Sequence, residues 1–152
     1  MAAQDGEAVP ELPESPSQTV IPAQLTFTVA EFTGRAGELA RLDALLGEER
    51  AASAAVPVAI ISGAPGIGKS TLAVHWAHRV ASRFPDGQLY LNLRGFGPAG
   101  QPVTPVEAIR GFLDAFEIPP TRTPSTLEAQ AGLFRSLLAG KRSSWCSTTP
   151  PT

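Results

Sequence analysis

A glycine-rich stretch over residues 63–71 constrains this chain more than any other feature. It reads Gly63-Ala64-Pro65-Gly66-Ile67-Gly68-Lys69-Ser70-Thr71 and follows the apolar run 58–61. The spacing is that of a phosphate-binding loop, in which successive backbone N–H groups turn inward at dihedral angles that glycine reaches most easily. Apolar positions at helical spacing continue from Leu72 to Val80. The pattern therefore predicts a strand, a loop and a helix whose N-terminus favours an anion.

The chemistry of such a loop gives its residues distinct roles. Lys69 would place a compact cation against the β- and γ-phosphates of a nucleotide, and the Ser70 hydroxyl would be a ligand of the bridging Mg²⁺. We therefore predict nucleotide contacts throughout residues 63–71 and a metal ligand at Ser70. No catalytic residue is predicted.

Composition limits the partners of the chain. Its 152 residues suffice for one domain, and its net charge of −2 comes without a basic run that could follow a nucleic-acid backbone. We expect no direct binding to nucleic acid. The apolar runs are too short for a membrane span and the first residues are acidic, so we expect no membrane segment and a cytoplasmic location. Cys146 is the single cysteine, which excludes an internal disulfide.

Local signals predict the remaining elements. Residues 1–30 are rich in Pro, Ser and Gln at the start and are expected to form a disordered linker. A helix is expected after Thr33 as N-cap, and two more are expected after capping boxes that begin at Thr104 and Ser125. The alternation over residues 88–94 predicts a strand. His75 and His78 are expected on a solvated helix face, because no further metal ligand accompanies them.

Several of these segments together resemble a known family. They are Glu31-Phe32-Thr33-Gly34-Arg35, the loop 63–71, and residues 73–80, 83–90 and 135–140. The chain is similar to the NB-ARC branch of the STAND signalling ATPases, and more closely to the nucleotide-binding part of actinobacterial AfsR/SARP-type transcriptional regulators, over residues 31–142. The resemblance implies an α/β P-loop NTPase with a parallel sheet and flanking helices. It also implies that Arg35 lines the adenine and ribose side of bound ATP or ADP, although Ala36 stands where relatives carry Glu.

The resemblance further implies a switch that is incomplete here. In the family, ADP holds a closed state, ATP permits self-association, and slow hydrolysis resets the switch. An apolar strand that ends in Asp-Asn or Asp-Asp supplies the acidic group for hydrolysis. This chain instead has Ser143-Ser144-Trp145-Cys146-Ser147-Thr148-Thr149-Pro150. We therefore expect a domain truncated before that strand, impaired hydrolysis, and a central strand at 58–61 without partners, which predicts marginal stability.

The codon junctions suggest a cause for the unusual ending. If the serines use TCN codons, a shifted reading frame from Arg142 encodes five apolar residues and then two limited to Tyr, His, Asn or Asp. We therefore interpret residues 143–152 as a frameshifted tail, a hypothesis that the DNA sequence tests. Two other readings of the whole chain stay open: a P-loop kinase or phosphotransferase acting on a small molecule, and a non-functional gene remnant.

Overall fold

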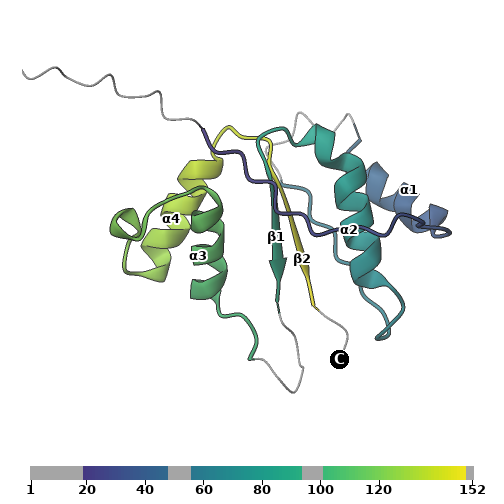
Figure 1. The fold of residues 1–152 in the computed structure, drawn as a ribbon. Coiled ribbons are helices and arrows are strands. Elements are labelled where there is room, and N and C mark those ends of the chain that lie inside the picture. Colours follow the sequence, from purple (N-terminus) through teal and green to yellow (C-terminus); the bar gives the residue numbers. More distant parts are fainter. Residues whose placement is uncertain (1–18, 48–55, 94–100, 150–152) are drawn as a thin grey trace, which may run out of the picture.

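The computed structural model describes residues 19–47, 56–93 and 101–149. Six elements of regular structure follow one another, with single 3₁₀ turns after the second and the fourth; they are α1 (Ala36–Ala44), α2 (Lys69–Val80), β1 (Gln88–Asn92), α3 (Pro105–Ala115), α4 (Leu127–Leu138) and β2 (Ser144–Thr148). β1 and β2 form a parallel two-stranded sheet between two helical layers (Figure 1). The predicted α/β class with a parallel sheet and flanking helices is confirmed in this small form.

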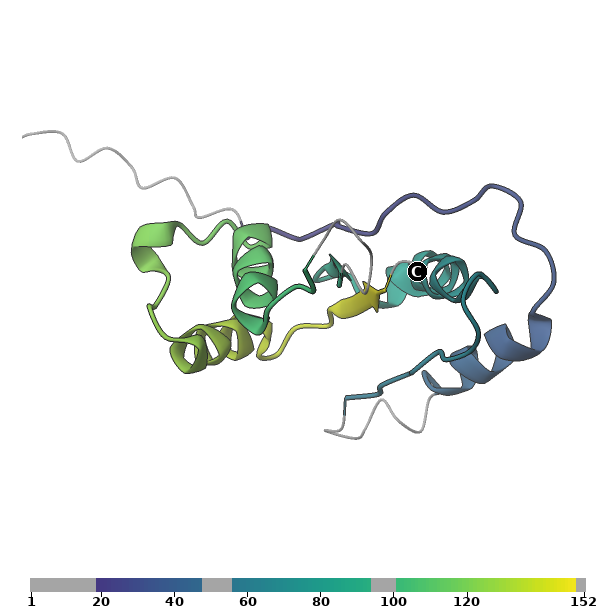
Figure 2. The same cartoon turned by 90° about the horizontal axis from the view of Figure 1, so that it is seen from below.

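Each helical layer has its own core. On one side of the sheet, Leu89 of β1 packs with Phe112 and Phe116 of α3, and partly buried residues of α4 close this cluster. On the other side, Leu39 and Leu42 of α1 pack with Leu72 of α2. The turned view in Figure 2 shows the sheet lying between the α3–α4 pair and the α1–α2 pair.

The sheet register is fixed just before its strands begin. Asp86 Oδ2 accepts a hydrogen bond from the Arg142 backbone N–H at 2.6 Å, and the Asp86 N–H donates to the Arg142 carbonyl at 3.2 Å. These bonds join the turn before β1 to the turn before β2, and Leu89 then lies opposite Trp145. Both strands consequently run the same way and end at the same edge of the sheet.

The helix starts agree with the sequence at one of three positions. Thr104 and Glu107 form the predicted capping box of α3, with Glu107 N–H donating to Thr104 Oγ1 at 3.3 Å and Thr104 N–H donating to Glu107 Oε2 at 2.8 Å. The predicted box at Ser125 is wrong by one residue, because the Thr126 side chain accepts the bond from Ala129 N–H. Thr33 is not the cap of α1, which begins after Arg35 in the left-handed region.

The expected strand at 58–61 is not formed. Residues 56–62 belong to no strand, and the side chains of Val58 and Ile60 are 74% and 88% exposed. The physical reason is that a strand needs a neighbour for its backbone groups, and no other described segment lies in position to supply one. The sequence also failed to indicate β2, because Ser144–Thr148 has little of the apolar character expected of a buried strand.

The segment before α1 contacts the sheet edge. Gln88 N–H donates to the Pro22 carbonyl at 2.8 Å, and Gln24 N–H donates to the Gln88 carbonyl at 2.9 Å. Figure 1 shows this purple segment crossing in front of both strands toward α1. Of the predicted linker 1–30, residues 1–18 lie outside the described part, and residues 22–24 extend the sheet by a single bridge to Gln88. None of the described helices is long and apolar enough to cross a bilayer.

Candidate nucleotide-binding site

The glycine loop leads directly into α2. Gly66 and Gly68 have φ angles of 77° and 84°, in the left-handed region that glycine enters without strain, and Gly68 is the N-cap of the helix. Gly63 has a φ angle of 153°, which residues with a side chain rarely adopt, so this position also favours glycine. The predicted order of loop and helix is confirmed, whereas the strand before them is absent from the described structure.

The loop is open to approach by a ligand. Residues 63–67 are all exposed, and the first turn of the twelve-residue helix α2 follows them. The early N–H groups of a helix lack partners within it, and the helix dipole adds a partial positive charge there. A phosphate is the ligand that this combination suits best.

Three of the four polar side chains predicted to contact a nucleotide hydrogen-bond to backbone carbonyls of the chain. Lys69 Nζ donates to the Ala64 carbonyl at 2.8 Å, within the loop itself. The Arg35 guanidinium donates to the Ile67 carbonyl, also in the loop. Ser70 Oγ donates to the Thr149 carbonyl at 3.3 Å, just beyond the end of β2. The structure therefore brings Arg35, Lys69 and Ser70 to one place, with their donors turned toward the loop or the strand end.

Arg35 reaches the loop from a strained backbone position. Its φ angle is 56°, which is uncommon for a residue with a side chain, and it occupies the N-cap position of α1. A second contact, 3.9 Å to Glu38 Oε1, lies within the same helix. Residues held in such conformations often serve a site, since the surrounding structure must offset the strain. The role of Arg35 toward the adenine and ribose remains a prediction that no bound nucleotide tests.

The sequence did not indicate that the C-terminal strand reaches the site. Tyr90 Oη and Thr148 Oγ1 are 2.6 Å apart. The carbonyl of the next residue, Thr149, accepts the hydrogen bond from Ser70. The carboxyl ends of parallel strands meet at one edge of a sheet, and ligands of α/β folds bind at that edge. The parallel order of β1 and β2 therefore points to these residues, once β2 is known to be a strand.

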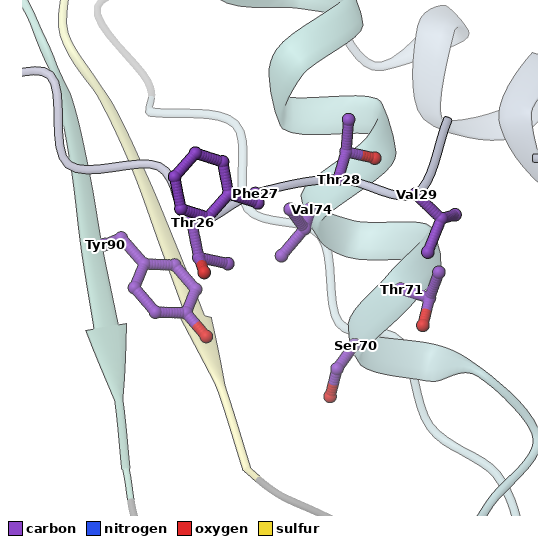
Figure 3. A pocket seen from close by; sticks show the side chains of 8 residues that line it. All are labelled: Thr26, Phe27, Thr28, Val29, Ser70, Thr71, Val74 and Tyr90. Carbon is purple, nitrogen blue, oxygen red and sulfur yellow. The ribbon is translucent and has the colours of Figure 1, made fainter. Parts of the chain in front are cut away.

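A small pocket adjoins the first turn of α2. Its volume is about 180 Å³, and it is lined by Thr26, Phe27, Thr28, Val29, Ser70, Thr71, Val74 and Tyr90. Figure 3 shows Tyr90 and Ser70 on opposite sides of the pocket, with the segment 26–29 crossing it. The sequence predicted a linker for that segment and gave no sign of its place beside the loop.

The donor set fits only part of a magnesium site. Mg²⁺ bound with a nucleotide takes phosphate and water oxygens together with one or two protein ligands. Ser70 is placed to be one such ligand, whereas the end of β2 offers the hydroxyls and carbonyls of Thr148 and Thr149. Among the residues in the described ranges, no group of three or more His, Cys, Asp or Glu could hold a metal ion.

The two histidines of α2 differ in their burial and in their contacts. The His75 ring stacks on Phe32 with centroids 4.1 Å apart, and it is half-buried rather than solvated as predicted. His78 is exposed, and its Nε2 lies 2.7 Å from the Thr26 carbonyl. Both rings therefore help to attach α2 to the segment before α1.

With this geometry established, comparisons with known proteins define the class. Residues 31–142 match the model of the AAA ATPase domain, and the chain belongs to that family of P-loop proteins. The match covers the loop, Arg35 and all four helices.

Two curated relatives place the chain more narrowly. The regulatory protein AfsR of Streptomyces coelicolor is 42% identical over 132 residues, which make up 85% of this chain and 13% of that protein. The regulatory protein AfsR of Streptomyces griseus is 42% identical over 122 residues, or 80% of this chain and 12% of that protein. No solved structure matched. The chain thus corresponds to an AfsR-like AAA ATPase region that spans about an eighth of these relatives.

Proposed function

We propose that residues 31–142 bind ATP and ADP as the nucleotide-sensing part of an AfsR-like regulator in the cytoplasm. The observation that carries the proposal is that Lys69 and Arg35 bond carbonyls of the glycine loop, while Ser70, in the first turn of α2, bonds the Thr149 carbonyl beside it. Each side chain is held there by a carbonyl that a phosphate or sugar oxygen could replace. Membership of the AAA ATPase family and the identity to AfsR support the same function.

We further propose that this module works as a switch of the STAND type, with the NB-ARC arrangement of Arg35. In such a switch, ADP and ATP favour different conformations, and the nucleotide thereby controls self-association. The electrostatic basis is that the γ-phosphate would add charge beside Lys69, and Ser70 would help to hold the Mg²⁺ that offsets it. Any transcriptional output would require further parts of the protein, because this chain carries no basic surface run suited to DNA.

Hydrolysis is proposed to be slow or absent. A P-loop ATPase uses a carboxylate near the metal to orient the attacking water. At the end of β2, Ser70 bonds the Thr149 carbonyl and Thr148 bonds Tyr90, and neither threonine carries a carboxylate that could supply that charge. Bound ATP would consequently persist, and the chain would act as a binder with little turnover. The frameshift hypothesis for residues 143–152 stays a prediction, to be tested on the DNA across codon 142.

Titration calorimetry of the 152-residue chain with MgATP and MgADP tests the proposal. Lys69→Ala is expected to weaken binding of both nucleotides by at least about tenfold, which corresponds to about 1.4 kcal/mol. Lys141→Ala is the matched control, because Lys141 is the other lysine of the chain and lies over the Phe116 ring, away from the loop. The control should bind as the native chain does.

Two results would count against nucleotide binding at this loop. One is the absence of heat with either nucleotide on folded protein, and the other is equal affinity of the native chain and Lys69→Ala. Phosphate release measured on the same samples tests the proposed lack of turnover. Transfer of phosphate to an added small-molecule acceptor would support a kinase instead.

A further inference from the structure

Two parts of the chain have the form of strand partners but do not pair with each other. The first is the segment 56–62, whose backbone makes no hydrogen bond to any other described residue. Val56, Val58 and Ile60 alternate along it and are 82%, 74% and 88% exposed. Side chains at this spacing lie on one side of an extended chain. The segment therefore presents an apolar face together with unpaired backbone groups.

The second part is the outer edge of β2. The sheet has two strands in the described structure, so β2 pairs with β1 on one side and with no strand on the other. Within β2, the Trp145 side chain is 57% exposed. An open strand edge presents a row of backbone donors and acceptors that another chain can use.

Neither part carries a charged side chain that would oppose strand addition. Residues 56–62 and 144–148 contain no charged side chain, whereas proteins usually protect an open edge with lysine, proline or a bulge. Pro57 lies near the beginning of its segment, where a missing N–H does not interrupt the ladder that follows. Two uncharged elements can approach each other without electrostatic repulsion.

Within one chain the two parts are held apart. Residue 62 continues at once into the loop, and the loop ends at the start of α2, which fixes the end of the segment. Figure 2 shows the segment running outside the sheet, apart from β2.

We propose that the segment 56–62 of one copy adds as a strand to the outer edge of β2 in a second copy. The pairing satisfies backbone groups on both elements and removes Val58 and Ile60 from water. A reciprocal exchange closes into a dimer, and a one-way exchange continues into longer assemblies. Self-association by this route uses the sheet and not the nucleotide loop, so it is independent of the function proposed above.

Sedimentation of the full 152-residue chain over a wide range of concentration tests this interface. The native chain should gain mass with concentration, and Ile60→Lys should weaken the association by at least about tenfold by introducing a charge into the new pair. Ala59→Pro should do the same, because it removes one backbone donor without adding charge. Phe27→Lys is the matched control: Phe27 is fully exposed, lies outside both elements, and should leave association unchanged.

Cross-linking then locates the partner strand. Cys146 lies in the middle of β2 and is the single cysteine of the native chain. V58C and I60C variants, mixed as light and heavy isotopic forms and oxidised, should yield disulfides to Cys146 between different copies, and F27C should not. The proposal is overturned if the native chain is monomeric at every concentration. It is also overturned if Ile60→Lys associates as strongly as the native chain, or if neither variant cross-links to Cys146.

Discussion

The two sides of the sheet differ in how completely they are built. On the α3–α4 side, Phe112 is stacked on Phe134 at 5.1 Å and meets the Trp145 edge at 4.8 Å, and Leu89 and Leu113 are each 1% exposed. On the α1–α2 side, the core consists of Leu39, Leu42 and Leu72 with partly buried neighbours. The chain that leads into this second side, residues 56–62, leaves its valines in water.

The difference shows which interactions each side needs. The α3–α4 side consists of two helices that cover one face of the paired strands β1 and β2, so every element on this side finds its partner within the described chain. The side that holds the glycine loop needs a strand beneath the loop, and no described residue pairs with the segment that precedes the loop. The loop and its helix nevertheless form, because their hydrogen bonds are local.

The largest effect is expected from removing the central ring of the better-packed side. Phe112→Ala should destabilise the protein by about 3–5 kcal/mol, and Leu72→Ala in the other core by about 2–3 kcal/mol, because its partly buried neighbours can relax into the space. Trp145 reports on the first side and Trp76, bonded to Asp43 at 2.9 Å, reports on the second. Urea unfolding of W76F and W145F variants separates the two signals.

The same measurement tests the comparison itself. We expect the Trp76 signal to change at lower urea than the Trp145 signal in otherwise native protein. The distinction between the sides would be removed if the Trp76 and Trp145 signals changed at the same urea concentration and if Phe112→Ala and Leu72→Ala lost equal stability. The protein would then unfold as one cooperative unit.

Hydrogen exchange should distinguish paired from unpaired backbone directly. The amides of residues 58–62 should exchange at least about tenfold faster than those of β1, since only β1 lies in a hydrogen-bonded ladder. Exchange followed by mass spectrometry at low protein concentration avoids strand addition between copies. Protection of residues 58–62 equal to that of β1 would mean that these residues are paired after all.

A smaller effect is expected at the start of α4. Thr126→Ala should cost about 1 kcal/mol, because the side chain accepts a hydrogen bond from Ala129 N–H at 3.3 Å. Ser125→Ala is the matched control and should change stability by less than about 0.5 kcal/mol. Urea midpoints measure both. If Ser125→Ala is the more harmful of the two, the cap lies where the sequence predicted it.

The smallest effect concerns the thiol in β2. Burial raises the pKa of Cys146, because the thiolate would lose its hydration. Above the ordinary thiol pKa the unfolded chain releases this proton while the folded chain retains it, so stability should fall as pH rises through that range and level off beyond the raised pKa. Cys146→Ser should flatten this part of the profile of urea midpoint against pH. An unchanged slope would assign the pH dependence to other groups.

Sequence reasoning succeeded where the signal is short-range. The capping box at Thr104 and Glu107, the glycine loop and the helix after it were all predicted, because each depends on residues a few positions apart. It failed for the strand at 58–61 and for β2, whose existence depends on a partner far along the chain. The prediction of Ser125 as the cap of α4 was wrong for a different reason. Ser125 and Thr126 are adjacent and both carry a hydroxyl that can cap a helix, and the packing of α4 selects Thr126.

By itself the sequence determined the glycine loop and the helix that follows it, because the glycines, Lys69 and Ser70 lie within eight residues and their geometry follows from local backbone preferences. The tertiary structure decided that Arg35 reaches this loop, that Thr149 meets Ser70, and that residues 56–62 remain without a neighbour. The physical reason is the range of the hydrogen bonds concerned. A helix or a turn satisfies its backbone within a few residues, whereas a strand can do so only with another strand that the fold brings beside it.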